Sequence, residues 1–261
     1  GLVGSEMCIR DSSKSVYDGT SSVAYSNWKY NYAVDSNNPG LAYSMFDIPH
    51  RVMVSVGYRT PRYAKGFMAT TVSLVYNGYV GQRYSLTMNE SYYDAEKKKT
   101  VYIDYNGDGW GGNSLLYIPT EDELQKMDFK TEEDRRKFDE WIEGDSYAKK
   151  HRGAYAMRNS NSAPWENRVD LHVAQDIFVL KDRGSKFQVT FDVTNFANML
   201  NKKWGTTYTA AYNVMPLQVI GSKKGEDGNY TNTYAYNSRN TITKNDVLSR
   251  WHAQIGFKYI F

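Results

Sequence analysis

The chain has 261 residues, and its 32 Lys and Arg against 29 Asp and Glu give a formal net charge of +3. This near-balance provides no electrostatic footprint for nucleic acid, and a single cysteine excludes an internal disulfide framework or a thiolate zinc site. No apolar run approaches the roughly 20 residues of a transmembrane helix. Transmembrane β-strands remain possible, because they alternate apolar and polar residues and therefore score as hydrophilic on average.

The first 12 residues have no strand periodicity and contain the only cysteine, Cys8. They are not a signal peptide, because a basic start followed by an apolar run of roughly 7–15 residues is missing. They resemble translated sequencing-adaptor text, so we expect residues 1–12 to be non-native and leave them out of the predicted fold.

Five segments further along the chain alternate with period two, which predicts strands with one apolar and one polar face. The clearest is 187–194, where Phe187, Val189, Phe191 and Val193 alternate with Gln188, Thr190, Asp192 and Thr194. The five predicted strands are 51–59, 68–77, 168–180, 187–194 and 251–261.

The connections between these strands are alternately short and long. Thr60–Gly66 and Lys181–Ser185 are short, whereas about 80–166 and 196–248 are long. Brief periplasmic turns and extended extracellular loops are typical of outer-membrane barrels, and most of the strands are long enough to cross an apolar band of about 25 Å. A two-sheet sandwich would also alternate, but with shorter strands whose apolar faces are covered by a second sheet.

The long connection 80–166 carries the only helical pattern. Thr120 with Glu123 fits a capping box, and Thr131 with Asp134 fits a second helix start. In 131–143, Phe138, Trp141 and Ile142 have helical spacing. We expect a short amphipathic helix packed on the strands of its own loop.

Asp104, Asn106 and Asp108, followed by Gly109, place oxygen ligands at alternate positions, like the first half of a calcium-binding loop. Leu115 occupies the position where that loop would need a bidentate Glu. The sequence therefore predicts either a structural calcium site or an Asp/Asn/Gly turn. No other cofactor is expected, and no acid–base pair or nucleophile supports an enzyme.

The last strand places Ile255, Phe257, Tyr259 and Phe261 on one face. This ending resembles the C-terminal assembly signal of bacterial outer-membrane barrels, which implies recognition by the barrel assembly machinery. The alternative is a soluble edge strand, which would leave a long apolar edge of the kind that soluble proteins usually avoid.

Several longer segments together resemble TonB-dependent outer-membrane receptors of the Bacteroidetes type, in the group with carboxypeptidase-regulatory-like N-terminal domains (Oar-like). The resemblance covers nearly everything after residue 12. The segments that carry it are 46–52, 102–109, 116–119, 150–159, 163–168 and 248–256.

The resemblance implies a 22-stranded barrel, an N-terminal plug and a TonB-contacting segment. None of those N-terminal parts is present here, and five firm strands are too few to close a barrel. We therefore expect an all-β C-terminal fragment over 13–261. Its antiparallel strands would form an incomplete, open part of a transmembrane β-barrel, with a short helical insertion in one extracellular loop.

The resemblance further implies a place in the bacterial outer membrane and a role in binding and importing a scarce nutrient. The implied partners are membrane lipid and the TonB complex, the latter through the missing plug region. The polar strand faces would form part of a wetted lumen wall made by Arg168, Asp170, His172, Gln188, Thr190 and Asp192. Two alternatives stay open: a small plug-less porin or adhesin, and a secreted β-sandwich binding module.

Overall fold

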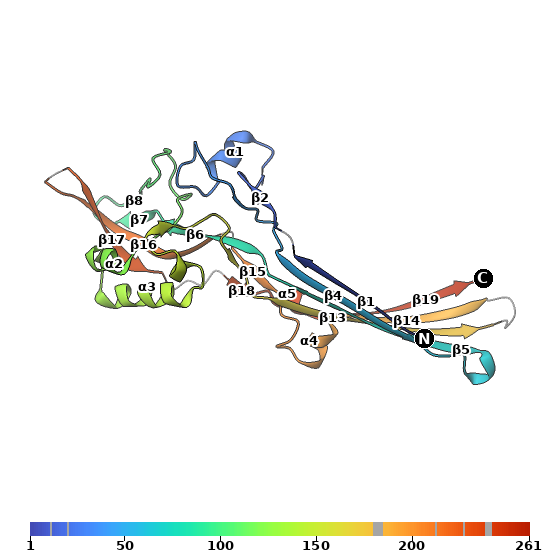
Figure 1. Cartoon of the computed structure of the whole chain (residues 1–261). Helices are drawn as coiled ribbons and strands as arrows, with labels where there is room; N and C mark the ends of the chain where they lie inside the picture. Colours follow the sequence, from blue (N-terminus) through green and yellow to red (C-terminus); the bar gives the residue numbers. More distant parts are fainter. Residues whose placement is uncertain (11, 20, 180–184, 212, 227, 238–241) are drawn as a thin grey trace.

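The structure, a computed structural model, describes residues 1–261 except 11, 20, 180–184, 212, 227 and 238–241. The molecule is elongated (Figure 1). One half is a long sheet of six strands. The other half, which we call the loop unit, is built from the two long connections, residues 80–165 and 196–248, and contains a second sheet with helices beside it.

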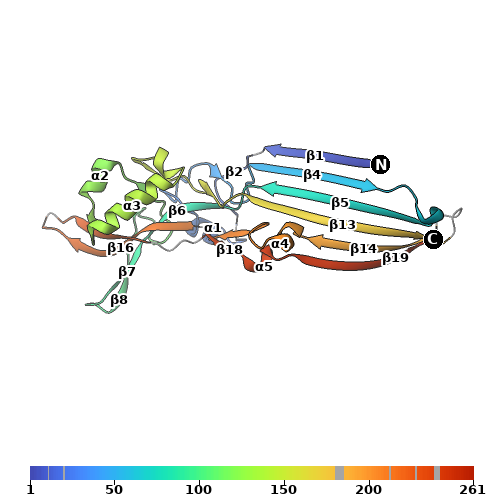
Figure 2. The ribbon, with the colours of Figure 1, turned by 90° about the horizontal axis from the view of Figure 1, so that it is seen from below.

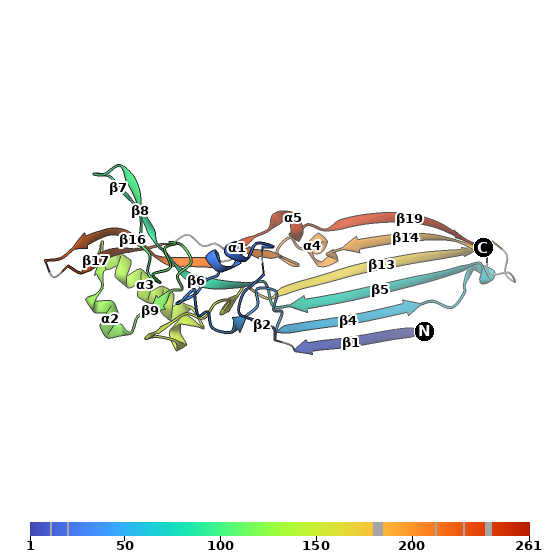
Figure 3. The same ribbon diagram turned by 90° about the horizontal axis from the view of Figure 1, so that it is seen from above.

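The six-stranded sheet is entirely antiparallel, with the order β1-β4-β5-β13-β14-β19 (Figure 3). All five predicted strands are confirmed over their described residues, with position 180 of the strand 168–180 outside them, and they occupy neighbouring places in the sheet. β1 and β19 are its edges, and the described strands do not close into a barrel. The bounds are β1 (Leu2–Arg10), β4 (His50–Arg59), β5 (Met68–Tyr79), β13 (Glu166–Phe178), β14 (Lys186–Thr194) and β19 (His252–Ile260).

Residues 1–12 were left out of the predicted fold, but in the structure β1 pairs with β4 over nine positions. The side chains of β1 nevertheless do not follow the pattern of its neighbour. Glu6 lies opposite Val54 in the apolar face, while Val3 and Met7 lie on the polar face. Main-chain hydrogen bonds at an open edge need no matching side-chain pattern. The non-native origin of residues 1–12 stays a prediction.

The apolar face of the sheet is open to the surroundings. The register aligns Val56 with Leu74, Leu74 with Leu171, and Phe191 with Ile255. The residues in these rows are well exposed: Val56 by 43%, Leu74 by 42% and Ile255 by 63%. In a sandwich these side chains would be buried against a second sheet, so the structure argues against that alternative.

The connections also follow the predicted alternation. Residues 60–67, with the 3-10 helix η1 (Ala64–Gly66), join β4 to β5 at the end of the sheet where both termini lie (Figure 2). The turn predicted at 181–185 falls mostly outside the described residues. Both long connections leave from the opposite end and build the loop unit.

The sheet of the loop unit is mixed rather than antiparallel throughout. β16 pairs antiparallel with β17 and parallel with β6, which is possible because a long stretch of chain separates β6 from β16. The strand order is β10 (Asp128–Phe129), β17 (Tyr230–Tyr236), β16 (Asn213–Lys224), β6 (Arg83–Asn89) and β12 (Asn161–Ser162).

The two predicted helix starts are confirmed. α2 (Glu121–Lys126) has a complete capping box between Thr120 and Glu123, and α3 (Glu132–Gly144) is capped by the Thr131 side chain. Phe138 and Ile142 of α3 are fully buried, and the helix contacts β10, β16 and β17. The prediction that this helix packs on the strands of its own loop holds only for β10, because β16 and β17 belong to the other long connection. The charged residues of the helix stay at the surface.

Short elements complete the described chain. None of the helices in this part of the chain is long and apolar enough to cross a bilayer. The elements are α1 (Ala24–Lys29), β2 (Lys14–Ser15), β3 (Ala42–Tyr43), β7 (Ser91–Asp94), β8 (Lys99–Tyr102), β9 (Tyr117–Ile118), η2 (Ala148–Lys150), β11 (Ala154–Tyr155), α4 (Phe196–Leu200), β15 (Tyr208–Ala210), β18 (Ile242–Lys244) and α5 (Asp246–Ser249).

Candidate functional site

A buried polar junction lies where the long sheet meets the loop unit. Residues 13–47, which connect β1 to β4, meet β6 and the residues just before β12 there. Arg83 of β6 is the first anchor: its Nε and Nη2 donate to Asp47 Oδ2, each at 2.6 Å. The other oxygen of Asp47 accepts from the Ser13 N–H at 2.7 Å. Both residues of the pair are buried and therefore shielded from water.

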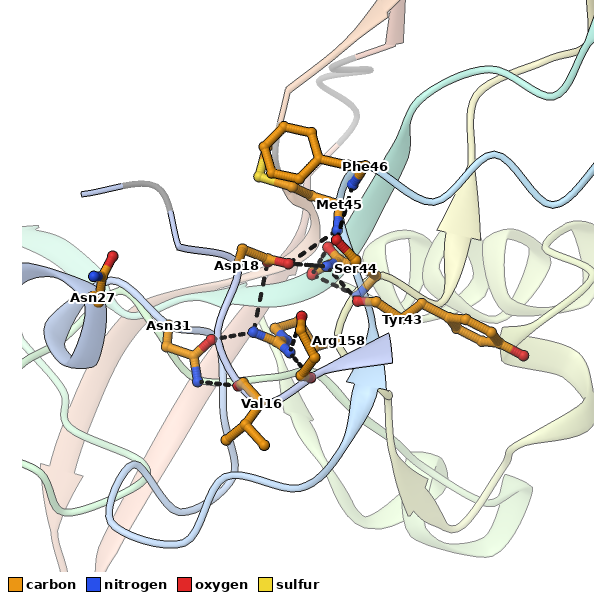
Figure 4. A network of polar contacts seen from close by, with 12 residues as sticks. Val16, Asp18, Asn27, Asn31, Tyr43, Ser44, Met45, Phe46 and Arg158 are labelled. Carbon is orange, nitrogen blue, oxygen red and sulfur yellow. Dashed lines mark hydrogen bonds and ion pairs between the residues drawn. The ribbon is translucent and has the colours of Figure 1, made fainter. Parts of the chain in front are cut away.

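Arg158 is the second anchor (Figure 4). Its guanidinium donates to Asn31 Oδ1 and to the Ser15 carbonyl, each at 2.5 Å, and lies 3.6 Å from Asp18 Oδ2. Burial lowers the pKa of Arg158, and the neighbouring Asp18 carboxylate opposes that shift. Arginine stays charged even when it is buried. The Arg158 guanidinium therefore needs the hydrogen-bond acceptors that surround it.

Asn159 links the same elements from the other side. Its backbone is left-handed, with φ of 56°, a conformation that Asn tolerates better than most residues. The side-chain Nδ2 reaches Asp18 Oδ2 at 3.0 Å and the Tyr43 carbonyl at 2.8 Å. Arg83 contacts both Asp47 and the Asn159 carbonyl, so residues 46–52 and 150–159 meet at this junction.

A cavity of about 310 Å³ opens beside this junction. Its polar groups already bind one another: Asp18 accepts from the Met45 N–H at 2.9 Å, and Asn27 exchanges hydrogen bonds with the Ser21 backbone. These hydrogen-bonded groups therefore form part of the wall of the cavity, and the cavity has room for a small molecule. It is lined by Asp18, Gly19, Asn27, Tyr30, Asn31, Tyr32, Met45 and Asn159.

Two chain segments approach each other closely at Gly81, which lies against Ala163 and Pro164. A Cβ on Gly81 would lie 2.7 Å from the Pro164 carbonyl oxygen and 2.8 Å from the Ala163 Cβ. Only glycine fits at this contact between the start of the loop unit and the chain that returns to β13.

The residues predicted to line a lumen all lie on the polar face of the six-stranded sheet. His172 and Asp192 face each other across β13 and β14, and His172 Nδ1 hydrogen-bonds Asp192 Oδ1. Arg168 Nε donates to Asp170 Oδ1 at 3.2 Å. Thr190 and Gln188 lie on the same face, opposite Ala174 and Asp176. These six side chains share a surface, and the lumen itself stays a prediction.

Asp176 lies on the same face but was not among the predicted lumen residues. It is only 2% exposed. Its Oδ2 binds Lys186 Nζ at 2.7 Å and Arg59 Nη2 at 2.8 Å, and Gln188 Nε2 donates to Oδ1 at 2.8 Å. Alternation placed Asp176 on this face, but the three partners come from β4 and β14 and could be identified only with the strand register.

The three residues of the candidate calcium loop form hydrogen-bonded turns. Asp104 accepts from the Asp108 and Gly109 N–H groups at 3.2 and 2.7 Å. Burial opposes ionisation of Asp108, but donors including Ser36, Asn113 and the Trp110 N–H hold its pKa below the ordinary value. Asn106 Oδ1 also accepts from Asp108 N. Within the described residues no group of three His, Cys, Asp or Glu could hold a metal, and calcium here stays a prediction.

The four residues of the predicted assembly signal lie at the edge of the sheet. Ile255, Phe257 and Tyr259 lie on the apolar face of β19, and Phe261 follows the end of the strand. All are exposed, by 63%, 81%, 48% and 97% in chain order. Recognition by an assembly machinery stays a prediction.

Comparison with known proteins adds no assignment: the chain matches no protein-family model, no curated protein and no solved structure.

Proposed function

We propose that the chain is part of an outer-membrane receptor of the TonB-dependent type, and that its six-stranded sheet forms part of the wall of a transmembrane barrel. One observation carries the proposal. The apolar side chains of five adjacent strands, β4, β5, β13, β14 and β19, share one exposed face, while ion pairs and amides occupy the reverse. A sheet wetted on one side and in contact with lipid on the other needs this division.

The dimensions of the sheet support the same proposal. A membrane-spanning strand needs about 9–11 residues at a tilt, and these five strands have between 9 and 13. An exposed apolar face of this extent would make a water-soluble protein aggregate.

The receptor type rests on the segments that carry the family resemblance and on the way several of them meet in the polar junction. In this proposal the receptor imports a scarce nutrient across the outer membrane. The loop unit faces the outside, and the polar face forms part of the lumen wall. Its partners would be membrane lipid, the barrel assembly machinery and, through a plug region, the TonB complex.

Spin labels on consecutive residues of β14 test the membrane assignment. In a Cys8→Ser background, the variants Val189→Cys, Thr190→Cys and Phe191→Cys are labelled, and the protein is folded into lipid vesicles. We expect the labels at 189 and 191 to be relaxed by oxygen, which concentrates in lipid, and the label at 190 by a water-soluble nickel chelate. Equal access of the nickel chelate to all three labels would contradict the proposal.

A further inference from the structure

A second pocket lies inside the loop unit, away from the polar junction and from the six-stranded sheet. It has a volume of about 300 Å³. Met88, Leu115 and Leu217, all buried, form its apolar floor. Four tyrosines from separate elements surround that floor: Tyr105, Tyr117, Tyr155 and Tyr234.

The hydroxyls of Tyr105, Tyr117 and Tyr234 form hydrogen bonds within the protein. Tyr105 OH donates to Tyr234 OH at 3.5 Å and accepts from Asn232 Nδ2 at 3.0 Å. Tyr117 OH donates to Glu123 at 3.0 Å, and its ring meets the Tyr155 ring edge-on with centroids 5.1 Å apart. The pocket therefore offers mainly aromatic carbon to a ligand, with few free hydrogen-bonding groups.

Glu123 supplies the only formal charge among the residues that line the pocket, and none of the ten is a Lys or Arg. Its carboxylate accepts from the Thr120 N–H and from the Thr120 and Tyr117 hydroxyls at 2.9–3.0 Å. The hydrogen bond from the Thr120 N–H, and after it those from the Tyr117 and Thr120 hydroxyls, hold the pKa of Glu123 below its ordinary value. The carboxylate is thus ionised at neutral pH, at the exposed rim of an aromatic pocket.

We propose that this pocket binds a small organic cation, such as a quaternary ammonium group. The faces of aromatic rings carry negative electrostatic potential and attract cations that are weakly hydrated. The carboxylate adds charge complementarity, and it also repels anions. A sugar would need several unpaired hydrogen-bonding groups, and a metal ion would need more than one carboxylate.

This inference goes beyond the proposed function, because it does not depend on where the six-stranded sheet resides. Binding is measured on the whole chain by titration calorimetry in a polyoxyethylene detergent, which contains neither a cation nor a sugar that could occupy the pocket. The probe is choline. Its control is 3,3-dimethylbutan-1-ol, which has the same shape with carbon in place of the charged nitrogen.

We expect choline to bind about tenfold more tightly than the neutral control, the difference that a partly desolvated cation–π site provides. Glu123→Gln should weaken choline binding and leave the control unchanged. Gln at this position can keep the capping box, so helix α2 should persist. Glu121→Gln, on the same helix but outside the pocket, should have no effect on either ligand.

Two substitutions at Tyr155 distinguish the contribution of its ring from that of its hydroxyl. Tyr155→Leu should weaken choline binding, whereas Tyr155→Phe, which keeps the ring, should not. Equal affinities for the two probes, or no choline binding at millimolar concentration, would overturn the proposal. Choline binding that is insensitive to both Glu123→Gln and Tyr155→Leu would overturn it as well, because the cation would then bind elsewhere.

Discussion

Arg83 and Asp47 form an ion pair inside the protein, with Nη2 and Oδ2 2.6 Å apart and only 8% and 2% of the two side chains exposed. The Arg83 guanidinium also lies 4.0 Å from the centre of the Tyr43 ring. The pair joins the connection between β1 and β4 to the first strand of the loop unit. It therefore ties the end of residues 13–47 to β6 at the polar junction.

Replacing Arg83 by Met should destabilise the loop unit strongly, because the Asp47 carboxylate would stay buried without its counter-ion. Breaking one partner of a buried pair typically costs about 3–5 kcal/mol, whereas replacing both by apolar residues costs much less. We expect Arg83→Met to lower the free energy of unfolding in urea, and Arg83→Met with Asp47→Leu to restore most of it. Lys97→Met, which removes an exposed ion pair with Asp94, is the control and should change little. Similar losses in all three variants would mean that the buried pair is unimportant.

Glu90 should make the stability of the loop unit depend on pH. It is 2% exposed, and burial raises its pKa above the ordinary value, although the Gly112 N–H donates to Oε2. Between the unfolded and the higher folded pKa, the folded state holds more protons, so stability falls as pH rises through that window. In Glu90→Gln the decline should be smaller and the midpoint of thermal unfolding at neutral pH higher. A parallel pH profile in the variant would show that another group titrates.

A charge on the apolar face should prevent stable folding in lipid. Phe191 lies between Val173 and Ile255 in the register of that face. An arginine near the middle of a bilayer costs about 2–4 kcal/mol on the lipid side of a strand and far less on the lumen side. We expect Phe191→Arg to reduce the free energy of folding into vesicles, measured by urea titration, and Thr190→Arg on the reverse face to be tolerated. The opposite order would reverse the assignment of the faces.

A calcium site and a hydrogen-bonded turn are the two alternatives for residues 104–109, and they would respond differently to added calcium. Because Asp104 and Asp108 already accept backbone N–H groups, we expect millimolar calcium to leave the thermal midpoint unchanged. Asp104→Ala should lower that midpoint with or without calcium, through the loss of two accepted hydrogen bonds. A calcium-dependent rise in the wild-type chain that disappears in Asp108→Asn would instead support a bound ion.

The parts of the fold that could be predicted from the sequence depend on local patterns. Period-two alternation predicted the ends of the strands at 51–59 and 187–194 to within about one residue. A strand with one apolar face must alternate apolar and polar residues along its whole length, so its bounds can be seen in the sequence. The start of each helix followed from a threonine and an acidic residue three positions later.

The remaining features depend on pairing between distant segments. The parallel contact of β6 with β16 joins two parts of the chain that no local pattern connects. Arg83 and Arg158 are buried, and arginine is rarely buried without a partner. Their burial could not be predicted, because their partners come from distant parts of the sequence. β1 was missed for a different reason: residues 1–12 have no strand periodicity and were set aside as non-native.

The outer strand β19 still has one row of backbone N–H and C=O groups that no described strand pairs with, along nine residues flanked by exposed aromatic rings. Such a row is a template on which any extended peptide can be laid down. Two molecules that meet there in water would pair β19 with β19 and extend each other's sheet. The unpaired edge of β19 is therefore a site at which the isolated protein would aggregate in water.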